Sequence, residues 1–531
     1  MTATATAQPR TSASAVLLVA GSVVAVIFAA PFAYLVLKNA SLADDVVAVL
    51  GSGRAVRPLL RTLGLAAAVS VSAAGVGTAV AWLVVRTDLP GRRLWAVAAP
   101  LPLVFPSFVA AAALQAAVAP RGMLEELVPA LRGHLPSVDG FVGAWLVLTL
   151  FTYPYVYLPV AARLASLPRS LEESARMLGR RPWGVFRTVV LPQIRSAVWA
   201  GALLVFLYTV SDYGAVAALR FNTLTVEIFS AGIYNQPKAA GLGLMLALVA
   251  LAVVVAERLA ANRRVAIEAG SGRRSLQVPL GWWRGPALAF VTLLLGNALL
   301  GPLSVLGYWA WRGLVRTGEA GAPSDLLVPT ANTAAIGLGT ALVTVAIVLP
   351  VAYLTARHRT PVGDVANAVV VAGFALPGLV VALALVRWVL DVPLLGRLYQ
   401  TIPILLAAYV VHFGAQAMRS AQVAVGTVPR RLDDAARVLG AGRWRRLRTI
   451  ELPLMLPGLV AGGGLVLLST MKELPATLLL RPTSIDTLAV HIWGAREAAR
   501  WADTGLASIV LVALSAVLTW RLVARRVEGF A

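Results

Sequence analysis

The stretch Ser170-Leu-Glu-Glu-Ser-Ala-Arg-Met-Leu-Gly179 occurs a second time as Arg431-Leu-Asp-Asp-Ala-Ala-Arg-Val-Leu-Gly440, and each copy runs on to a Leu-Pro pair. Anchor residues of the first copy recur in the second after a constant interval of 261 residues: Glu173 and Asp434, Gly179 and Gly440, Trp183 and Trp444, Pro192 and Pro453. A constant interval over several anchors indicates a duplication. Both copies are polar, whereas the sequence around them is strongly apolar.

The composition predicts a membrane protein. Of 531 residues, 59% are hydrophobic and only 13% are charged, whereas soluble proteins have about 25% charged residues. The mean hydropathy is +0.80. There is no cysteine, and the four histidines are scattered, which excludes thiol catalysis, disulfides and cysteine or histidine metal sites.

Apolar runs of about 20 residues, enough to cross a bilayer, recur along the chain. We predict twelve spans, near 14–37, 61–85, 94–118, 141–165, 196–218, 240–260, 285–311, 331–355, 364–389, 401–425, 455–480 and 505–524. The first run is too long for the core of a signal peptide, so we expect an uncleaved span. The fold class is therefore an all-α polytopic membrane protein.

The duplication divides the chain into two halves of six spans. Thr62 and Thr333, Arg86 and Arg357, and Pro106 and Pro377 are each 271 residues apart. We predict a first half at 1–261, a cytoplasmic linker at 262–283 and a second half at 284–531. With the N-terminus inside, cytoplasmic segments hold 30 of the 46 lysines and arginines, so the positive-inside rule predicts that both termini are cytoplasmic.

Each repeated segment is expected to be a short cytoplasmic helix. Ser170 and Glu173 have capping-box spacing, whereas Arg431 at the matching position predicts a weaker cap. We expect Leu171, Ala175 and Leu178 to share one face, as do Leu432, Ala436 and Leu439. Gly179 and Gly440 are expected in the left-handed conformation that ends a helix. A basic loop lying on anionic lipid is one interpretation; matched anchors in two copies favour docking on a two-fold cytoplasmic partner.

These segments resemble the EAA loops of bacterial ABC importer permeases, spaced E-A-A-x3-G-x9-I-x-L-P. The loops are at 168–192 and 429–453; the first departs from the pattern at Ser174 and Val189, and the second has Asp434 for glutamate. The resemblance implies two tandem six-helix (MetI-like) permease halves with coupling helices that sit on an ATPase dimer. The ATPase-coupling residues it implies are Glu172, Glu173, Ala175, Gly179, Trp183, Asp433, Asp434, Ala435, Ala436, Gly440 and Trp444.

A narrower resemblance follows each loop. Lys472-Glu-Leu-Pro475, with Arg481-Pro482 and Asp486, is similar to the fused permeases of ferric iron importers, and Ser211-Asp-Tyr-Gly214 is similar to the matching segment of their first half. The resemblance implies ferric iron as substrate, although thiamine and phosphonate permeases share the fused design. It also implies a bacterial plasma (inner) membrane location and an extracytoplasmic substrate-binding protein as partner.

The chain lacks a Walker A sequence, because none of its three lysines lies in the required Gly-x4-Gly-Lys-Ser/Thr context. We therefore expect no enzyme activity and no cofactor bound by this chain, with ATP and Mg²⁺ used by separate nucleotide-binding subunits, expected as a homodimer. The lipid bilayer is the other expected partner, and nucleic acid is not. A twelve-helix secondary transporter is the rival hypothesis. Such transporters typically carry ionisable groups within their spans, whereas the predicted spans of this chain contain few.

Candidate pathway residues are Asp212, Tyr213, Lys472, Glu473 and His412. Asp212 and Glu473 occupy the same repeat position, and an acid near hydrocarbon is by default a functional candidate. Alternatively, Asp212 pairs with Arg220, and Glu473 with Lys472 or Arg481, and these acids only fix a helix end. His412 either contributes to the pathway or forms a helix–helix hydrogen bond. We expect no tightly bound metal, and Pro106 and Pro377 are expected to break helices.

Overall fold

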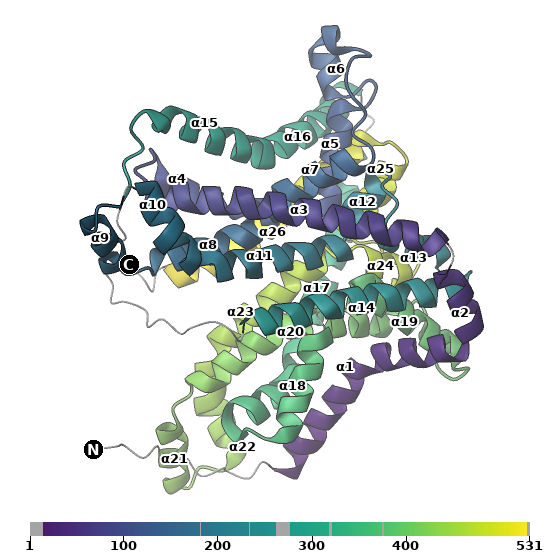
Figure 1. The fold of residues 1–531 in the computed structure, drawn as a ribbon. Coiled ribbons are helices and arrows are strands. Elements are labelled where there is room, and N and C mark those ends of the chain that lie inside the picture. Colours follow the sequence, from purple (N-terminus) through teal and green to yellow (C-terminus); the bar gives the residue numbers. More distant parts are fainter. Residues whose placement is uncertain are drawn as a thin grey trace. The chain divides into compact units, whose positions relative to one another are not determined.

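The computed structural model describes residues 14–51, 53–180, 182–232, 234–261, 277–317, 321–373 and 376–527. Within these ranges the regular structure is helical, apart from one isolated parallel β-bridge between Thr87 and Val278 (Figure 1). Because hydrocarbon offers no hydrogen-bond partners, a span must satisfy its backbone N–H and C=O groups internally, and a helix does so. The prediction of an all-α protein is confirmed.

Twelve candidate membrane spans overlap the twelve predicted ones. One is a pair of helices, Pro361–Gly373 and Gly378–Asp391, bent by 106° at the break between them. The other eleven found among the described residues extend over Ala15–Ser41, Ala55–Arg86, Ser107–Leu127, Phe141–Ala165, Phe186–Ser211, Gln236–Ala256, Gly281–Val315, Pro323–His358, Ile402–Thr427, Arg443–Met471 and Trp501–Thr519.

The chain forms two compact units, and each contains one copy of the repeated segment. The first-repeat unit comprises Ala43–Leu326 and His491–Ala513. Its helices are α2 (Ala43–Leu50), α3 (Gly53–Arg86), α4 (Arg92–Ala98), α5 (Ser107–Val118), α6 (Met123–Leu127), α7 (Phe141–Thr152), α8 (Pro154–Ala165), α9 (Arg169–Met177), α10 (Pro182–Val185), α11 (Leu191–Ser211), α12 (Gly214–Ala218), α13 (Leu224–Ala231), α14 (Gln236–Ala261), α15 (Arg284–Leu295) and α16 (Gly301–Trp311).

The second-repeat unit comprises Met1–Leu42, Leu327–Val490 and Leu514–Ala531. Its helices are α1 (Ala15–Ser41), α17 (Leu327–Tyr353), α18 (Pro361–Gly373), α19 (Gly378–Asp391), α20 (Ile402–Thr427), α21 (Arg430–Val438), α22 (Arg443–Arg446), α23 (Leu452–Met471) and α24 (Pro475–Leu480). The unit boundaries fall within α25 (Leu488–Glu497) and α26 (Trp501–Val527).

The two units have matching cores. In the first-repeat unit α3, α8 and α11 pack against one another, and in the second-repeat unit α17, α20 and α23 do the same (Figure 1). These helices correspond pairwise under the repeat intervals of 271 and 261 residues. The duplication inferred from motifs therefore extends to the packing of the spans.

The compact units do not coincide with the two halves of the sequence, because each half's first span packs into the other unit. Helix α1 packs on α18 and α19, where Phe28 is buried against Gly373 and Gly414 and Lys38 pairs with Asp391 (2.6 Å). Helix α16 packs on α5 in the first-repeat unit, where the indole Nε1 of Trp309 donates to the Ala116 carbonyl (3.1 Å).

Spans break at matched places. Pro106 and Pro377 directly precede α5 and α19 in extended conformation, so the prediction that they break helices is confirmed. Further breaks separate α11 from α12 at Asp212 and α23 from α24 near Glu473. Of the predicted linker, residues 262–276 lie outside the described ranges, and residues 277–283 lead into α15.

Candidate functional site

Helices α9 and α21, here called the repeat helices, begin at the same repeat position. Pro168 precedes α9 and Pro429 precedes α21, both in extended conformation. The predicted capping box is wrong, because α9 already begins at Arg169 and Ser170 lies inside its first turn. The residues at the N-cap positions, Pro168 and Pro429, form no side-chain cap hydrogen bond, so the predicted difference in capping is not found at these positions. Proline fixes the entry into each helix through its restricted φ angle.

The repeat helices also end in the same way. Gly179 has φ +78° and Gly440 has φ +77°. In α9 the amide of Gly179 donates to the Arg176 carbonyl (2.9 Å), and that of Arg180 donates to the Ala175 carbonyl (3.2 Å). The corresponding bonds in α21 are both 2.9 Å. This is the Schellman motif, which uses a left-handed residue to satisfy the last carbonyls, and it confirms the predicted role of the glycines.

The inner face of α9 holds a buried ion pair. Glu172 is 2% exposed and pairs with the guanidinium of Arg86, which is fully buried at the end of α3. The same guanidinium donates to the Leu164 carbonyl (3.4 Å) and lies 5.8 Å from the ring centre of Trp82. Ala175, one turn after Glu172, is buried beside it. Both groups of the pair are therefore held in place by packing as well as by charge.

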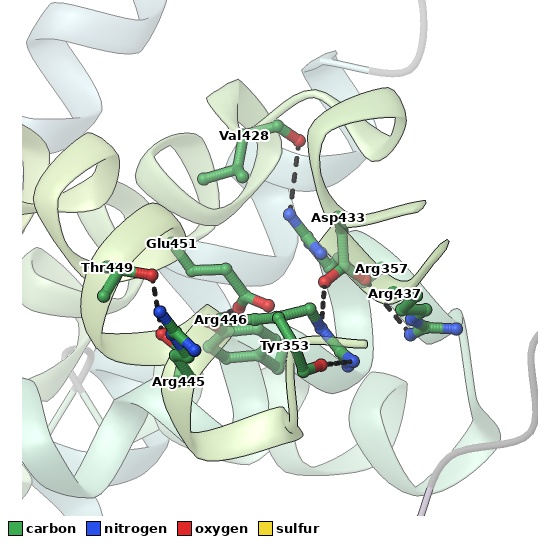
Figure 2. A network of polar contacts seen from close by, with 10 residues as sticks. Tyr353, Arg357, Val428, Asp433, Arg437, Arg445, Arg446, Thr449 and Glu451 are labelled. Atoms are coloured by element: carbon green, nitrogen blue, oxygen red, sulfur yellow. Dashed lines mark hydrogen bonds and ion pairs between the residues drawn. The ribbon is translucent and has the colours of Figure 1, made fainter. Parts of the chain in front are cut away.

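The inner face of α21 has the same burial pattern and a larger polar network (Figure 2). Asp433 accepts from Arg446 Nε (2.7 Å) and from Arg437 Nη2 (3.1 Å). Arg357, which matches Arg86, donates to the Val428 carbonyl (3.2 Å). Nearby, the Tyr353 hydroxyl of α17 donates to the buried carboxylate of Glu451. The second copy thus holds its acid with arginines of its own loop.

The C-terminal end of each repeat helix exposes two apolar side chains. Met177 and the following Leu178 at the end of α9, and Val438 and the following Leu439 at the end of α21, are between 82% and 88% exposed. The predicted common face of Leu178 with Ala175, and of Leu439 with Ala436, is wrong, because both alanines are buried and both leucines, next to the glycine, are exposed. Leu432 is also exposed, and the side chain of Leu171 lies outside the described residues.

Most of the remaining predicted coupling residues are exposed. Glu173, Asp434 and Ala435 are exposed, whereas Ala436 is buried. Trp444 is 64% exposed and its ring centre lies 5.0 Å from the Arg448 guanidinium. The side chain of Trp183 lies outside the described residues. The structure thus separates an acid that packs inward, Glu172 or Asp433, from one that faces outward, Glu173 or Asp434.

Among the pathway candidates, Asp212 is buried at the break between α11 and α12. Its carboxylate accepts from Ser107 Oγ (2.5 Å) and from the amide of Ala215 (2.9 Å), so it caps α12. The predicted alternative partner is wrong, because Arg220 pairs with Asp139 (3.7 Å). Tyr213 is buried between the rings of Phe229 and Trp493, with centre distances of 4.6 and 5.7 Å.

Glu473 occupies the matching break in the second-repeat unit. It accepts from the Ala476 amide (3.1 Å) and thereby caps α24. Gly378 replaces the serine found at position 107, and a Cβ there would lie 3.0 Å from Glu473 Oε1 and 3.2 Å from His412 Nε2. The glycine therefore allows Glu473 and His412 to approach the same point.

His412 forms the predicted hydrogen bond between helical segments. Its Nδ1 lies 3.1 Å from the Leu376 carbonyl at the break before α19. Lys472 directly follows the last residue of α23, and Arg481 pairs with Asp486 (3.4 Å) rather than with Glu473. Within the described ranges, no group of three or more histidine, aspartate or glutamate side chains could hold a metal ion.

Sequence reasoning missed the roles of Arg86, Ser107 and Arg446. Arg86 and its match Arg357 are anchors of the 271-residue interval. An arginine that recurs at the end of an apolar span in both halves could have indicated a buried structural cation. Ser107 directly follows the helix-breaking Pro106, but nothing in the sequence connects it to Asp212, which lies 105 residues further along.

Comparison with known proteins identifies relatives over most of the chain. The family model described as "Binding-protein-dependent transport system inner membrane component" matches residues 72–264 and 348–528, more than half of the chain. The Fe(3+)-transport system permease protein FbpB 2 of Haemophilus influenzae is 29% identical over 92% of this chain and 94% of its own length. A probable ABC transporter permease, y4fN of Sinorhizobium fredii, is 25% identical over 90% of this chain and 88% of its own length. The molybdenum transport system permease ModB of Azotobacter vinelandii is 31% identical, over 32% of this chain and 76% of its own length.

Proposed function

Because this chain belongs to the family of binding-protein-dependent transport system inner membrane components, it is a transport permease, and we propose that α9 and α21 couple it to separate ATPase subunits. Each would act as a coupling helix, seated on one subunit of an ATPase homodimer that uses ATP and Mg²⁺. ATP-driven closure of that dimer would move both helices together and switch the access of the transport path.

The observation that supports this proposal most strongly is the paired geometry of the repeat helices. Both begin after a proline, bury one acid, end in a Schellman motif and expose two adjacent apolar residues. Large exposed apolar side chains at the tip of a rigid element are typical of a docking surface. Two copies on one chain suit a partner that has two equivalent clefts.

We propose that the substrate is ferric iron. The similarity to the Haemophilus Fe(3+)-transport permease covers nearly the full length of both chains. Hard carboxylate oxygens such as those of Asp212 and Glu473 are the ligand type that suits Fe³⁺, so both acids stay candidates for the path, together with Tyr213, Lys472 and His412. An extracytoplasmic binding protein would deliver the ion.

We propose that both termini and both coupling helices face the cytoplasm of a bacterial inner membrane. The distribution of arginine in the short loops supports this orientation, since 30 of the 46 cations fall on that side. The ATPase docks on the same side, and the binding protein docks on the opposite one.

A double substitution of the exposed leucines, Leu178→Asp with Leu439→Asp, tests the proposal. Both side chains are more than 80% exposed, so the permease should fold, while a charge in an apolar contact should abolish the co-purification of the ATPase. Uptake of labelled ferric ion by cells should fall to the level of a strain without the gene. Leu394→Asp, at an 86% exposed leucine between α19 and α20 on the opposite side of the membrane, is the matched control for ATPase binding and should leave co-purification unchanged.

Two results would contradict parts of this proposal. Uptake that persists in the double variant, with no ATPase bound to the unchanged chain, would indicate a secondary transporter. Co-purification of an ATPase without any ferric uptake would leave the permease intact and remove iron as its substrate, with thiamine and phosphonates the next compounds to assay.

A further inference from the structure

The segment Gln277–Leu280 lies along the three residues that end and follow α3. The Val278 amide donates to the Arg86 carbonyl (2.7 Å), and Thr87 and Val278 form a parallel β-bridge. The Leu280 amide donates to Asp88 Oδ1 (2.9 Å), and the Arg284 guanidinium pairs with Asp88 Oδ2. Between the two donating residues stands Pro279, which has no amide hydrogen and fits the outward position of such a bridge.

Arg86 connects this segment to α9. Its backbone carbonyl accepts from Val278, and its side chain pairs with Glu172 of α9. Because Arg86 is fully buried, its guanidinium has little freedom to move independently of its backbone. A change in the position of the segment 277–284 therefore changes the support of α9.

In the second-repeat unit the backbone takes a different course at the residue that matches Asp88. The position that corresponds to Asp88 is Arg359, which adopts a left-handed conformation (φ 50°), and the next amide, of Thr360, turns back to the Leu354 carbonyl (3.2 Å). Asp433 of α21 is instead held by Arg446 from its own loop (2.7 Å). The two repeat helices thus end alike, but the buried acid of α9 pairs with Arg86 of α3, whereas that of α21 pairs with Arg446 of its own loop.

We infer that the segment 277–284, where the connection between the two halves ends, positions the coupling helix α9 through Arg86, with Asp88 as the positioning residue. The inference rests on the proposed docking role of α9. The Leu280 amide and then the Arg284 guanidinium hold the pKa of Asp88 below its usual range, so the carboxylate is charged at neutral pH. The connection between the halves would thereby act directly on the support of α9.

A cysteine pair tests the contact itself. The chain has no cysteine, so Thr87→Cys with Val278→Cys places the only two thiols on bridged residues, within the range that a disulfide spans. We expect oxidation of the assembled transporter in membranes to cross-link the pair almost completely. Val278→Cys paired with Leu94→Cys, at an exposed residue of α4, is the control and should stay largely uncross-linked.

The variant Asp88→Asn tests the effect on coupling. We expect the ATP hydrolysed per ion imported, measured on the assembled transporter in vesicles, to rise by about two- to five-fold, the range for losing one partly exposed ion pair. A purely structural defect would lower hydrolysis and import together. Arg284→Gln removes the same contact from the other side and should give the same ratio, whereas Asp325→Asn, at an exposed aspartate of the same unit, should not.

The outcomes separate the two proposals. An unchanged ratio in both Asp88→Asn and Arg284→Gln, or a pair that does not cross-link, would overturn the positioning role while the ATPase still co-purifies. Failure of the ATPase to co-purify with the unchanged chain would overturn the proposed function, and this inference with it.

Discussion

At the scale of single residues, a buried guanidinium without a carboxylate is among the least stable arrangements in a protein, and Arg86 avoids it by pairing with Glu172. Both side chains are almost completely buried, so removing either one leaves an uncompensated charge, whereas removing both does not. The motif residues that face outward, Glu173 and Asp434, have no such constraint. Residue type alone therefore does not distinguish a structural acid from a docking acid in this loop.

The variant Arg86→Met is expected to destabilise the first-repeat unit by about 3–5 kcal/mol, because Glu172 would be left buried and unpaired. Thermal unfolding of the purified permease in detergent measures this effect. The double variant Arg86→Met with Glu172→Met should recover most of the lost stability, since no isolated charge remains. If the single variant melts at the same temperature as the unchanged protein, the ion pair contributes nothing and the packing argument is wrong.

At the scale of elements, the breaks in the spans are stabilised by local polar groups. A helix that ends inside apolar surroundings leaves amides and carbonyls without partners. At the break after α11, Asp212 satisfies amides of α12 and accepts from Ser107; at the break after α23, Glu473 satisfies an amide of α24. These contacts support a capping role for both acids, whereas their contact with substrate stays a prediction.

Substitutions at Asp212 separate capping from a role in transport. Asp212→Ala should cost about 0.5–2 kcal/mol of thermal stability, the range for losing a helix N-cap, and leaves Ser107 without its acceptor. Asp212→Asn keeps an oxygen for the Ala215 amide and places an NH2 group where Ser107 Oγ can accept from it, while it removes the charge. If the acid only caps α12, Asp212→Asn should import ferric ion within two-fold of the unchanged protein. A loss of import with unchanged stability would assign the charge to the pathway.

At the scale of the whole molecule, the halves of the sequence exchange their first spans between the compact units. Helix α1 packs on α18, and the ring of Phe28 lies where Gly373 and Gly414 leave room for it. Helix α16 packs on α5 in the same manner. Each compact unit therefore contains a span from the other half of the sequence.

Cleavage of the chain between residues 268 and 269, at an introduced protease site, is expected to leave the two fragments associated in detergent. The reason is that α1 on the first fragment packs within the unit formed by the second. Phe28→Ala should weaken this association, since loss of a buried aromatic side chain costs about 3–5 kcal/mol in protein interiors. Val26→Ala, at a 67% exposed residue of α1, is the matched control. Fragments of the unchanged chain that separate after cleavage would contradict the exchange.

The amino-acid sequence determined the features that depend on composition, period and local backbone chemistry. Apolar runs predicted the twelve spans, because a bilayer imposes a minimum length on each crossing. The repeat interval predicted two matching units, Pro106 and Pro377 predicted broken helices, and Gly179 and Gly440 predicted the left-handed helix ends. Each of these features depends on residues close by in the sequence, on the length of an apolar run or on the interval between repeated residues.

Only the tertiary structure decided which residues at the repeated loops face inward, which support them and where the first spans pack. Ser170 and Leu178 were misplaced because a proline, rather than a side-chain cap, sets the start of α9, and because Leu178, next to the glycine, is exposed. The pairs Arg86 with Glu172 and Ser107 with Asp212 join residues 86 and 105 positions apart. Such contacts depend on how spans pack, and an apolar span fits several neighbours equally well by composition, so only the packed helices could assign them.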